Sequence, residues 1–276
     1  MGRDRLRMGL LVLLVAGLGE LCCERESLAR SPAVTAGRVT AGQTIPVFTA
    51  KVVKTYPHDA HAFTQGLEYH EGFLYESTGE RGQSSVRKVN LETGRVVEKV
   101  DLSAEYFGEG LTIFRGKIYQ LTWLSAKGFV YDLRSLAKVG EFSFYGEGWG
   151  LAHDEADLIM SDGTNTLRYL EPEKFTVVRT LPVYAGGEAV TNLNELEVIG
   201  GDIYANVWHA NRIARIDART GEVKAWIDCG AIAEKEQKEP EGVLNGIAFD
   251  AGRKRLFITG KDWAHVYEVR ADGLTF

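Results

Sequence analysis

The stretch "YFGEGLT", Tyr106–Thr112, decides the fold because its Gly-Leu step recurs along the chain. Related stretches are "QGLEY" from Gln65, "EGLTI" from Glu109, "WGLAH" from Trp149, "NELEV" from Asn194 and "NGIAF" from Asn245. The copies are separated by about 40 to 50 residues, a period typical of proteins built from repeated structural units. The repeat also raises a question, because Glu109 places a carboxylate between two glycines in otherwise apolar strand sequence.

Each copy is followed by a short turn and further short apolar segments. The second segments are "FLYEST" from Phe73, "KIYQLTW" from Lys117, "DLIMSDG" from Asp157, "DIYANVW" from Asp202 and "RLFITGK" from Arg255. A third segment follows in every repeat, and a fourth in the first four repeats. Alternating apolar residues bounded by Gly, Asp and Asn indicate half-buried antiparallel strands. Five repeats with the same internal order predict an all-β fold, a five-bladed β-propeller.

The fifth repeat is one strand short. It ends at Phe276 after "HVYEVR", whereas the segment "IPVFTAKVVKTY", Ile45–Tyr56, precedes the first repeat and has no partner. Pairing this N-terminal strand with the last blade would close the ring and cover strand edges that otherwise invite aggregation. We therefore predict a ring closed by an N-terminal strand that completes the last blade.

Composition and the N-terminus set the domain organisation. The chain has 276 residues, a formal net charge of −6, and three arginines before an apolar run, Met8–Leu18, that is too short to span a bilayer. Residues 1–23 are predicted to be a signal peptide or lipoprotein leader, with Cys22 or Cys23 as the lipid attachment point in the second case. Residues 24–44 are predicted to be a linker and residues 45–276 the propeller, so we expect an exported, periplasmic or secreted protein, or a membrane-anchored lipoprotein. The acidic charge argues against nucleic-acid binding.

The repeats place a set of polar and aromatic residues at one end of the ring. In an antiparallel blade the start of strand one and the end of strand two open onto the same face. The residues before each Gly-Leu step are Gln65, Glu109, Trp149, Asn194 and Asn245, and the residues at the ends of the aligned second strands are Gly79, Trp123, Gly163, Trp208 and Lys261. One carboxylate, one ammonium, several amides and three tryptophans are therefore predicted to converge.

Each of these residues alone has an ordinary explanation. Trp149 alone would be core, Asn245 a turn residue and Lys261 a solvated surface charge. Together they indicate a functional mouth, because an acid and a base among aromatic walls are costly to desolvate unless they are paired or used. Other patterns are absent from the sequence: no HExxH or CxxC metal motif, no nucleophile elbow and no phosphate loop. The charged run "EKEQKEPE", Glu234–Glu241, is predicted to be a solvated excursion between blades four and five.

The ordered motifs resemble one family. "PHDAHAFTQGL", "ESTGERGQSSVRKV", "YFGEGLT", "GWGLA", "SDGT", "LNELE", "ANVW", "VLNGIAFD" and "TGKDW" together are similar to the plant-and-bacterial type of glutaminyl-peptide cyclotransferase, or glutaminyl cyclase. The resemblance covers nearly all of Pro57 to Glu268. It implies a five-bladed propeller that converts N-terminal glutaminyl residues of peptides or proteins to pyroglutamyl with release of ammonia. It also implies that no zinc is used. From the missing zinc-ligand pattern and from Lys261 at the mouth, we expect no other metal, and we expect no cofactor.

The resemblance further implies nine active-site positions. They are Phe63, Gln65, Phe107, Glu109, Trp123, Trp149, Asn194, Trp208 and Lys261, of which all but Phe63 and Phe107 also follow from the repeat alignment. The expected catalytic residues are Glu109, a proton shuttle between two nitrogens, and Lys261 and Asn194, which stabilise charge on the γ-oxygen. The amide of Gln65 is an alternative donor to that oxygen. Phe63, Gln65, Phe107, Trp123, Trp149 and Trp208 are expected to bind the substrate.

Two other functions stay open from the sequence. One is a calcium-dependent lactonase-like propeller hydrolase, in which Glu109, Asn194 and Asn245 would ligate an axial metal. Lys261 argues against it because an ammonium group would repel a divalent cation, and only one acid lies among the aligned mouth residues. The other is a non-catalytic propeller that binds peptide termini, from which only turnover distinguishes an enzyme. We expect a monomer that acts on peptides or proteins with N-terminal Gln.

Overall fold

The computed structural model describes residues 44–276. The predicted leader with Cys22 and Cys23, and the predicted linker apart from Thr44, lie outside the described residues. Within the described part of the chain, no helix combines the length and the apolar character needed to cross a membrane.

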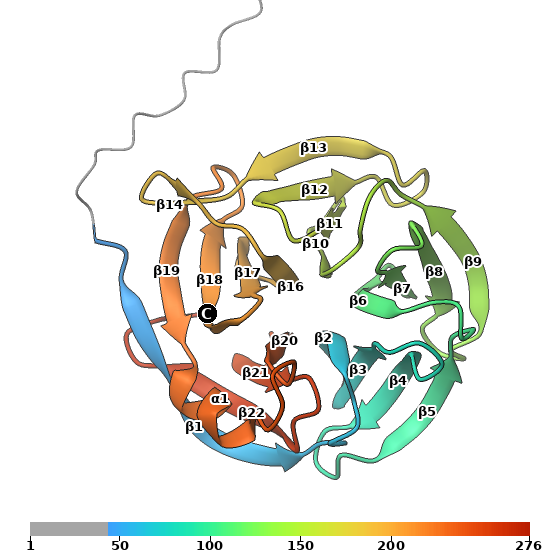
Figure 1. Cartoon of the computed structure of the whole chain (residues 1–276), viewed down its shortest axis with the longest axis horizontal. Coiled ribbons are helices and arrows are strands. Elements are labelled where there is room, and N and C mark those ends of the chain that lie inside the picture. The colour runs from blue at the N-terminus through green and yellow to red at the C-terminus, as the bar shows by residue number, and fades with distance from the viewer. Residues whose placement is uncertain (1–43) are drawn as a thin grey trace, which may run out of the picture. The chain divides into compact units, whose positions relative to one another are not determined.

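The described strands form five four-stranded units around a central axis (Figure 1). The first contains β2 (Thr64–His70), β3 (Phe73–Thr78), β4 (Ser85–Asn90) and β5 (Val96–Asp101). The second contains β6 (Gly108–Phe114), β7 (Lys117–Thr122), β8 (Lys127–Asp132) and β9 (Lys138–Ser143). The third contains β10 (Leu151–His153), β11 (Leu158–Met160), β12 (Thr166–Leu170) and β13 (Val177–Pro182).

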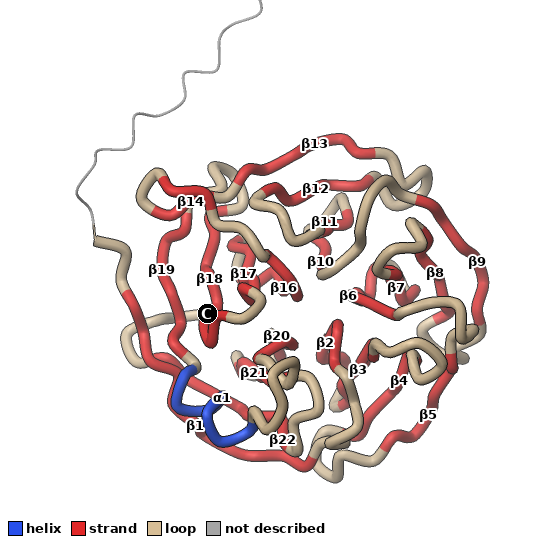
Figure 2. The backbone as a smooth tube through the Cα atoms, viewed as in Figure 1, coloured by secondary structure: helices blue, strands red, loops and turns tan. Residues whose placement is uncertain are grey.

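The last two units complete the ring. The fourth contains β16 (Leu193–Ile199), β17 (Asp202–Val207), β18 (Ala210–Asp217) and β19 (Val223–Asp228). The fifth contains β20 (Leu244–Asp250), β21 (Arg255–Gly260), β22 (His265–Ala271) and the N-terminal strand β1 (Val47–Pro57). A small hairpin, β14 (Tyr184–Ala185) and β15 (Glu188–Ala189), lies between the third and fourth units, and Figure 2 shows that loops connect nearly all the strands. The predicted all-β propeller is confirmed.

The N-terminal strand closes the ring as predicted. β1 pairs antiparallel with β22, with Ala50 opposite Ala271 and Pro57 opposite His265. Its first residues also pair parallel with β19, where Val47 lies opposite Trp226, so that β1 joins the fourth and fifth units into one eight-stranded sheet. This second pairing covers part of the outer edge of β19, from Trp226 to Asp228.

The glycine of the repeated Gly-Leu step is required where innermost strands approach each other. A Cβ atom on Gly110 would lie 2.5 Å from the backbone nitrogen of Leu151 in the next unit, and one on Gly66 would collide with the backbone nitrogen of Leu111. Only a residue without a side chain allows backbones to come so close. The motif recurs because neighbouring units meet in the same way at the axis.

The fourth repeat has no glycine at this close approach of innermost strands. There Glu195 replaces the glycine, and its buried carboxylate accepts hydrogen bonds from the backbone N–H groups of Leu67, at 3.2 Å, and Ile247, at 2.8 Å. These donors belong to the first and fifth units, so one side chain connects three innermost strands. Burial raises the pKa of Glu195 well above its usual range, against the effect of the two backbone hydrogen bonds.

The prediction that residues 234–241 form a solvated excursion is partly wrong. It begins within a short helix, α1 (Gly230–Glu236), which lies on the outside of the ring near β1 and β22 (Figures 1 and 2). Glu236 is buried, and its carboxylate accepts hydrogen bonds from the Tyr267 hydroxyl and the Ala264 backbone N–H and contacts His265 Nδ1 at 2.7 Å. Burial opposes ionisation, but these contacts outweigh it and lower the pKa of Glu236. The alternating charges of this segment suggested a solvated surface, but Glu236 is buried and contacts three residues.

Candidate active site

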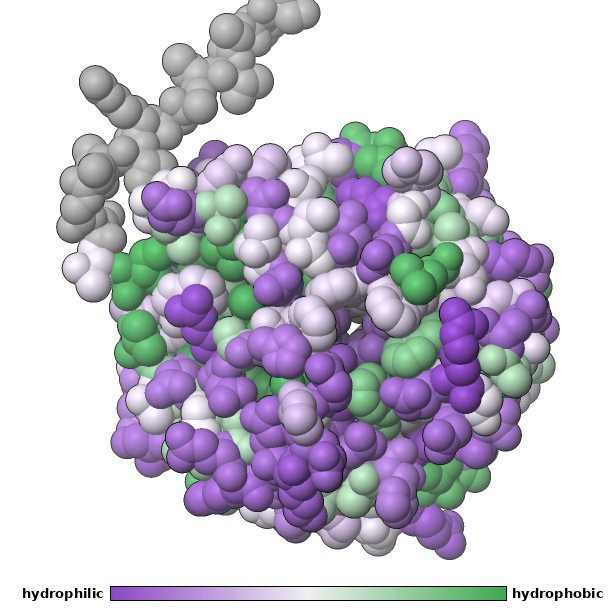
Figure 3. Space-filling view, in the orientation of Figure 1, coloured by the Kyte–Doolittle hydropathy of each residue, from purple (hydrophilic) through white to green (hydrophobic). Residues whose placement is uncertain are grey.

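One cavity of about 240 Å³ contains all nine predicted active-site residues. Its lining residues are Phe63, Gln65, Glu80, Phe107, Glu109, Trp123, Trp149, Asn194, Trp208, Glu241 and Lys261. They surround the axis of the ring, which Figure 3 shows hollowed near its centre. The volume suits a single amino-acid side chain with its α-amine rather than a long segment of peptide.

The repeat geometry explains why these residues meet. Gln65, Glu109 and Asn194 lie on the innermost strands β2, β6 and β16, and Trp149 lies two residues before the start of β10. Trp123, Trp208 and Lys261 directly follow the second strands β7, β17 and β21. Both sets therefore reach the same face of the ring, as predicted for antiparallel strands.

The aromatic residues form two arcs around the cavity. Phe107 packs edge-to-face against Phe63, with ring centroids 6.0 Å apart, and against Trp123 at 5.6 Å. Trp149 and Trp208 form a separate edge-to-face pair at 5.5 Å. Such pairs hold the rings in fixed orientations, and the apolar walls exclude water from the groups between them.

Two glycines at the predicted mouth make room for these rings. A Cβ atom on Gly79 would lie 2.5 Å from the Phe107 ring, and one on Gly163 would lie 2.7 Å from the Trp149 ring. Gly163 also has a φ of +78°, which side chains rarely adopt. The repeat alignment placed both glycines at the mouth without a role, and the structure shows that they seat the aromatic walls.

We expect Gly163→Ala to damage the site through Trp149. The added methyl group would displace the indole, and the residue would adopt a strained backbone conformation at a cost of roughly 1–2 kcal/mol. The midpoint of urea unfolding should fall modestly, while the KM for a substrate of this cavity should rise. Gly186→Ala is the matched control, because Gly186 also has positive φ, +61°, but nothing within 4 Å of an added Cβ atom. Equal KM values for the two variants would contradict the role in seating Trp149.

Glu109 is buried and held by a chain of amides. Its side chain is 4% exposed, and Oε1 accepts a hydrogen bond from Gln65 Nε2 at 2.9 Å. Gln65 Oε1 in turn accepts from Asn245 Nδ2 at 3.0 Å, which fixes the orientation of the Gln65 amide. Asn245 was predicted at the mouth, but it is fully buried and does not line the cavity. Its role is to orient Gln65.

The pKa values of Glu109 and Lys261 are both shifted in the direction that favours the neutral form of each group. Burial raises the pKa of Glu109 well above its usual range, although Lys261 acts in the opposite direction, and the like charge of Glu147 adds to the rise. Burial lowers the pKa of Lys261, although the nearby carboxylates of Glu109, Glu241 and Glu80 oppose this. The Lys261 ammonium also lies 4.8 Å from the centre of the Phe63 ring, a favourable cation–π contact. A carboxyl group with a raised pKa can exchange protons with an amine at small cost.

Two buried polar atoms of the cavity lack a protein partner. They are Asn194 Oδ1 and Trp208 Nε1, which have no hydrogen bond within the described residues. Buried polar groups are nearly always satisfied, so an unpaired acceptor and an unpaired donor on two residues that line one small cavity are a reason to expect a polar ligand there. An amide group, which carries both a donor and an acceptor, would complement this pair.

Three acidic residues of the site escaped the sequence analysis. Glu80 and Glu241 line the cavity, and Glu147 hydrogen-bonds two of its tryptophans. The cavity thus contains more than the single acid that the alignment counted. These residues lie in loops that differ between the units, so no repeat could indicate them, although Glu147 lies only two positions before Trp149.

The calcium site considered from the sequence involves Glu109, Asn194 and Asn245. Among residues 44–276, no group of three or more His, Cys, Asp and Glu side chains is arranged to hold a metal ion. Asn245, one of the three residues considered as calcium ligands, donates its amide N–H groups to Gln65 Oε1 and the Thr64 carbonyl. The side-chain oxygens of Asn194 and Asn245 are buried and have no hydrogen-bond partner within the described residues.

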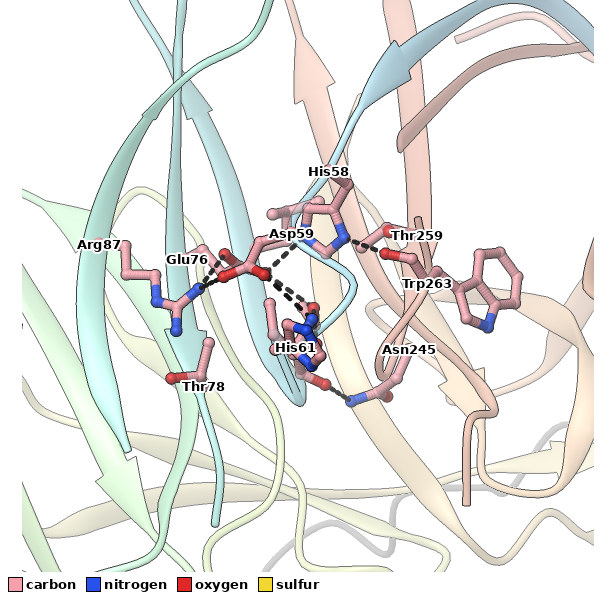
Figure 4. A network of polar contacts seen from close by, with 12 residues as sticks. His58, Asp59, His61, Glu76, Thr78, Arg87, Asn245, Thr259 and Trp263 are labelled. Atoms are coloured by element: carbon pink, nitrogen blue, oxygen red, sulfur yellow. Dashed lines mark hydrogen bonds and ion pairs between the residues drawn. The ribbon is translucent and has the colours of Figure 1, made fainter. Parts of the chain in front are cut away.

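A buried ion network anchors the loop that carries Phe63 (Figure 4). His58 contacts the Trp263 carbonyl through Nδ1 at 2.7 Å and Glu76 Oε1 through Nε2 at 2.8 Å. Both partners are acceptors, so both ring nitrogens donate and the ring is an imidazolium. Arg87 extends the network by pairing with Asp59 at 2.8 Å. The network connects the fifth unit to the first beside the active-site loop.

A second cavity of about 560 Å³ adjoins the first. The two share Phe63, Glu80 and Lys261, and the second also includes His61 and Asp262 among its lining residues. Most residues that line the second cavity have polar or charged side chains, whereas many of those that line the first are aromatic.

Known proteins resemble this chain in both sequence and structure. The sequence model of the family described as Glutamine cyclotransferase matches residues 24–271. The chain belongs to the glutamine cyclotransferase family. It is 45% identical over 227 residues to "Glutaminyl-peptide cyclotransferase" of Arabidopsis thaliana, a match that covers 80% of this chain and 70% of that protein. It also resembles the crystal structure of Myxococcus xanthus glutaminyl cyclase, with a TM-score of 0.78 and 37% identity, covering 83% of this chain and 99% of the other.

Proposed function

We propose that this glutamine cyclotransferase converts N-terminal glutaminyl residues of peptides and proteins to pyroglutamyl residues and releases ammonia. The observation that carries the proposal is a buried carboxyl group, Glu109, with a raised pKa in a small aromatic cavity that also contains a lysine. In the reaction the α-amine attacks the γ-carbonyl carbon of the same residue, a C–N bond forms, and the bond to the amide nitrogen breaks. No external nucleophile is needed, so the site mainly has to fold the substrate and move one proton.

Glu109 moves that proton. As the α-amine attacks, its nitrogen becomes acidic and transfers a proton to the Glu109 carboxylate, which then protonates the departing amide nitrogen to give ammonia. One carboxyl group suffices because the two nitrogens are bonded to the same carbon in the tetrahedral intermediate. The raised pKa of Glu109 lies closer to that of an amine than an ordinary carboxyl pKa does, so the proton moves in both directions at small cost.

The other cavity residues hold the substrate and its developing charge. Lys261 and the Asn194 amide stabilise negative charge on the γ-oxygen, and the unpartnered Trp208 Nε1 is a further donor in reach of the cavity. The aromatic arcs press the flexible glutaminyl side chain back towards its own α-amine. This supplies the proximity that an intramolecular attack requires. Turnover of a Gln-initiated peptide distinguishes this function from the calcium-dependent and non-catalytic alternatives.

We infer that the enzyme is exported. The basis is the apolar run after three arginines in the first 23 residues, which suits a signal peptide, or a lipoprotein leader that attaches lipid at Cys22 or Cys23. Residues 24–44 act as the linker to a catalytic domain of residues 45–276, which works as a monomer. The single cysteine of that domain, Cys229, is buried and free, so the domain folds without a disulfide.

A direct assay tests the function. Purified protein incubated with a Gln-initiated peptide should release one ammonia per peptide, and the product should lose its free N-terminus. Turnover should survive chelator treatment, because the proposed steps use only side chains of this chain. A matched peptide with N-terminal Asn is the control, since its side chain is one carbon too short for the same five-membered ring. Absence of turnover would refute the proposed function. Turnover that depends on a re-added metal ion would refute its metal-free form.

A further inference from the structure

Glu147 lies at a junction in the wall of the active site. It belongs to the loop between β9 and β10, and its Oε2 atom accepts hydrogen bonds from two indole N–H groups, Trp123 Nε1 at 2.7 Å and Trp149 Nε1 at 2.9 Å. The two tryptophans come from different units of the ring. One carboxylate oxygen therefore ties a side chain of the second unit to one at the entrance of the third.

This contact joins the two aromatic arcs. Phe63, Phe107 and Trp123 form one series of edge-to-face pairs, and Trp149 and Trp208 form the other. Within the described residues no ring pair connects Trp123 to Trp149. Trp123 is also 37% exposed, so packing alone holds it less firmly than the buried members of the wall. The carboxylate is the polar contact that completes the wall.

The backbone of Glu147 is itself fixed. Arg168, on β12, donates from Nη2 to the Glu147 carbonyl at 3.0 Å and from Nη1 to the Tyr145 carbonyl. The Gly148 N–H donates to the Trp123 carbonyl at 3.1 Å. The carboxylate is thus presented from an anchored loop rather than from a freely moving surface side chain.

We propose that Glu147 is a positioning residue that sets the orientation of Trp123 and Trp149 and so shapes the cavity for the folded glutaminyl side chain. It acts through the two indoles and does not touch the reacting atoms. The effect on turnover rests on the proposed cyclotransferase activity, whereas the effect on the indoles does not. Charge-assisted hydrogen bonds are about twice as strong as neutral ones, so a single carboxylate can order two rings.

The charge of Glu147 has a second consequence, on Glu109. The charged groups around Glu109 are Lys261 from the fifth unit, Glu147, and the other two acids that line the cavity, Glu80 and Glu241. Burial and the like charge of Glu147 raise the pKa of Glu109, and Lys261 lowers it. Removing only the charge of Glu147 should lower the pKa of Glu109, and the acid limb of kcat/KM should move to lower pH.

Two substitutions separate these effects. Glu147→Gln keeps an oxygen with two lone pairs that can accept both indole N–H groups, but it removes the charge. We expect its KM to stay near the wild-type value while the acid limb moves to lower pH. Glu147→Ala removes both hydrogen bonds, and we expect kcat/KM to fall about 10- to 100-fold, mainly through KM, as for other misplaced positioning groups. Glu173→Ala, at an exposed glutamate in the turn between β12 and β13, is the matched control.

A measurement without substrate makes the proposal independent of activity. Quenching of tryptophan fluorescence by acrylamide should increase in Glu147→Ala and stay near wild type in Glu147→Gln, because only the first releases the two indoles. Trp226 and Trp263 are buried and contribute a constant background. If the wild-type protein turns over no Gln-initiated peptide, the proposed function fails, and this comparison still tests the positioning role.

Trp123→Phe gives a test that does not require Glu147→Ala to fold. It keeps an aromatic ring but removes one N–H group, so KM should rise several-fold, and adding Glu147→Gln should not restore it. Where Glu147→Ala does fold, Trp123→Phe should add less to it than to the wild type, since the shared contact is already lost. Unchanged KM and unchanged quenching in Glu147→Ala, or full additivity of the two substitutions, would overturn the proposal.

Discussion

Glu109→Gln should lower kcat by roughly 10²- to 10⁴-fold, the range expected for the loss of general acid–base catalysis. Glutamine has the same shape, and its oxygen can still accept the hydrogen bond from Gln65 Nε2 that Glu109 accepts at 2.9 Å. It cannot accept the proton of the α-amine and return it to the leaving nitrogen. The cavity should therefore remain intact and KM should change little, so that the loss is confined to the chemical step.

The control for this substitution is a partly buried carboxyl group elsewhere on an innermost strand. Glu68, on β2, has a pKa raised by burial to about 7, but it lines a different cavity together with His153 and Glu197. Glu68→Gln should leave kcat within a few-fold of the wild-type value. The melting temperature of Glu109→Gln should be equal to that of the wild type or higher, because active-site charges are often held at a cost to stability. Near-native kcat in a folded Glu109→Gln variant would remove the proton-shuttle role.

The sequence repeat predicted the features that recur in every unit of the ring, namely the strands and the face at which they open. The Gly-Leu step marks the close approach of innermost strands, so its five copies located the units and the face on which Glu109 and Lys261 meet. Glu195 shows why the motif can vary, because its carboxylate satisfies two backbone N–H groups in place of the glycine contact. The position of these residues follows from local patterns alone.

Other features depend on loops that no repeat constrains. Glu147 reaches the tryptophans because Arg168 fixes its loop, and Glu236 is buried because donors from β22 and the loop before it meet it from a distant part of the chain. In both cases an acidic residue in a polar stretch looks solvated until its partners are known. The sequence contains these partners, but their separation of 21 to 31 residues without any periodicity hides the pairing.

The second large effect concerns stability, because the buried pair of His58 and Glu76 connects the first unit to the fifth beside the candidate active site. The side chains of the two residues are 2% and 1% exposed, their contact is 2.8 Å long, and Thr64 Oγ1 also donates to Glu76 at 2.7 Å. Glu76→Gln would leave the His58 imidazolium without its counter-charge in a site closed to water. Breaking a buried ion pair from one side costs about 3–5 kcal/mol of unfolding free energy.

The dependence of this loss on pH follows from the two pKa shifts. Burial lowers the pKa of His58, but the charge and hydrogen bond of Glu76 outweigh it, so the net shift is upward from 6.5. Burial raises the pKa of Glu76, but His58 and Arg87 outweigh it, so the net shift is downward from 4.5. The stabilisation by His58 is complete below 6.5 and is lost as pH rises through its folded pKa. That by Glu76 is complete above 4.5 and is lost as pH falls through its folded pKa.

The destabilisation by Glu76→Gln should therefore be largest between these two ordinary values, 4.5 and 6.5, and should shrink at alkaline pH, where His58 is neutral in both proteins. Urea unfolding of the wild type and the variant, between pH 4.5 and 6.5 and again at alkaline pH, measures this difference in unfolding free energy. Glu92→Gln, which breaks the exposed Lys54–Glu92 pair at 2.7 Å, is the matched control and should cost no more than about 1 kcal/mol. A loss from Glu76→Gln that is equally large at alkaline pH would mean that Glu76 stabilises the ring through packing and its bond to Thr64, and not through the imidazolium.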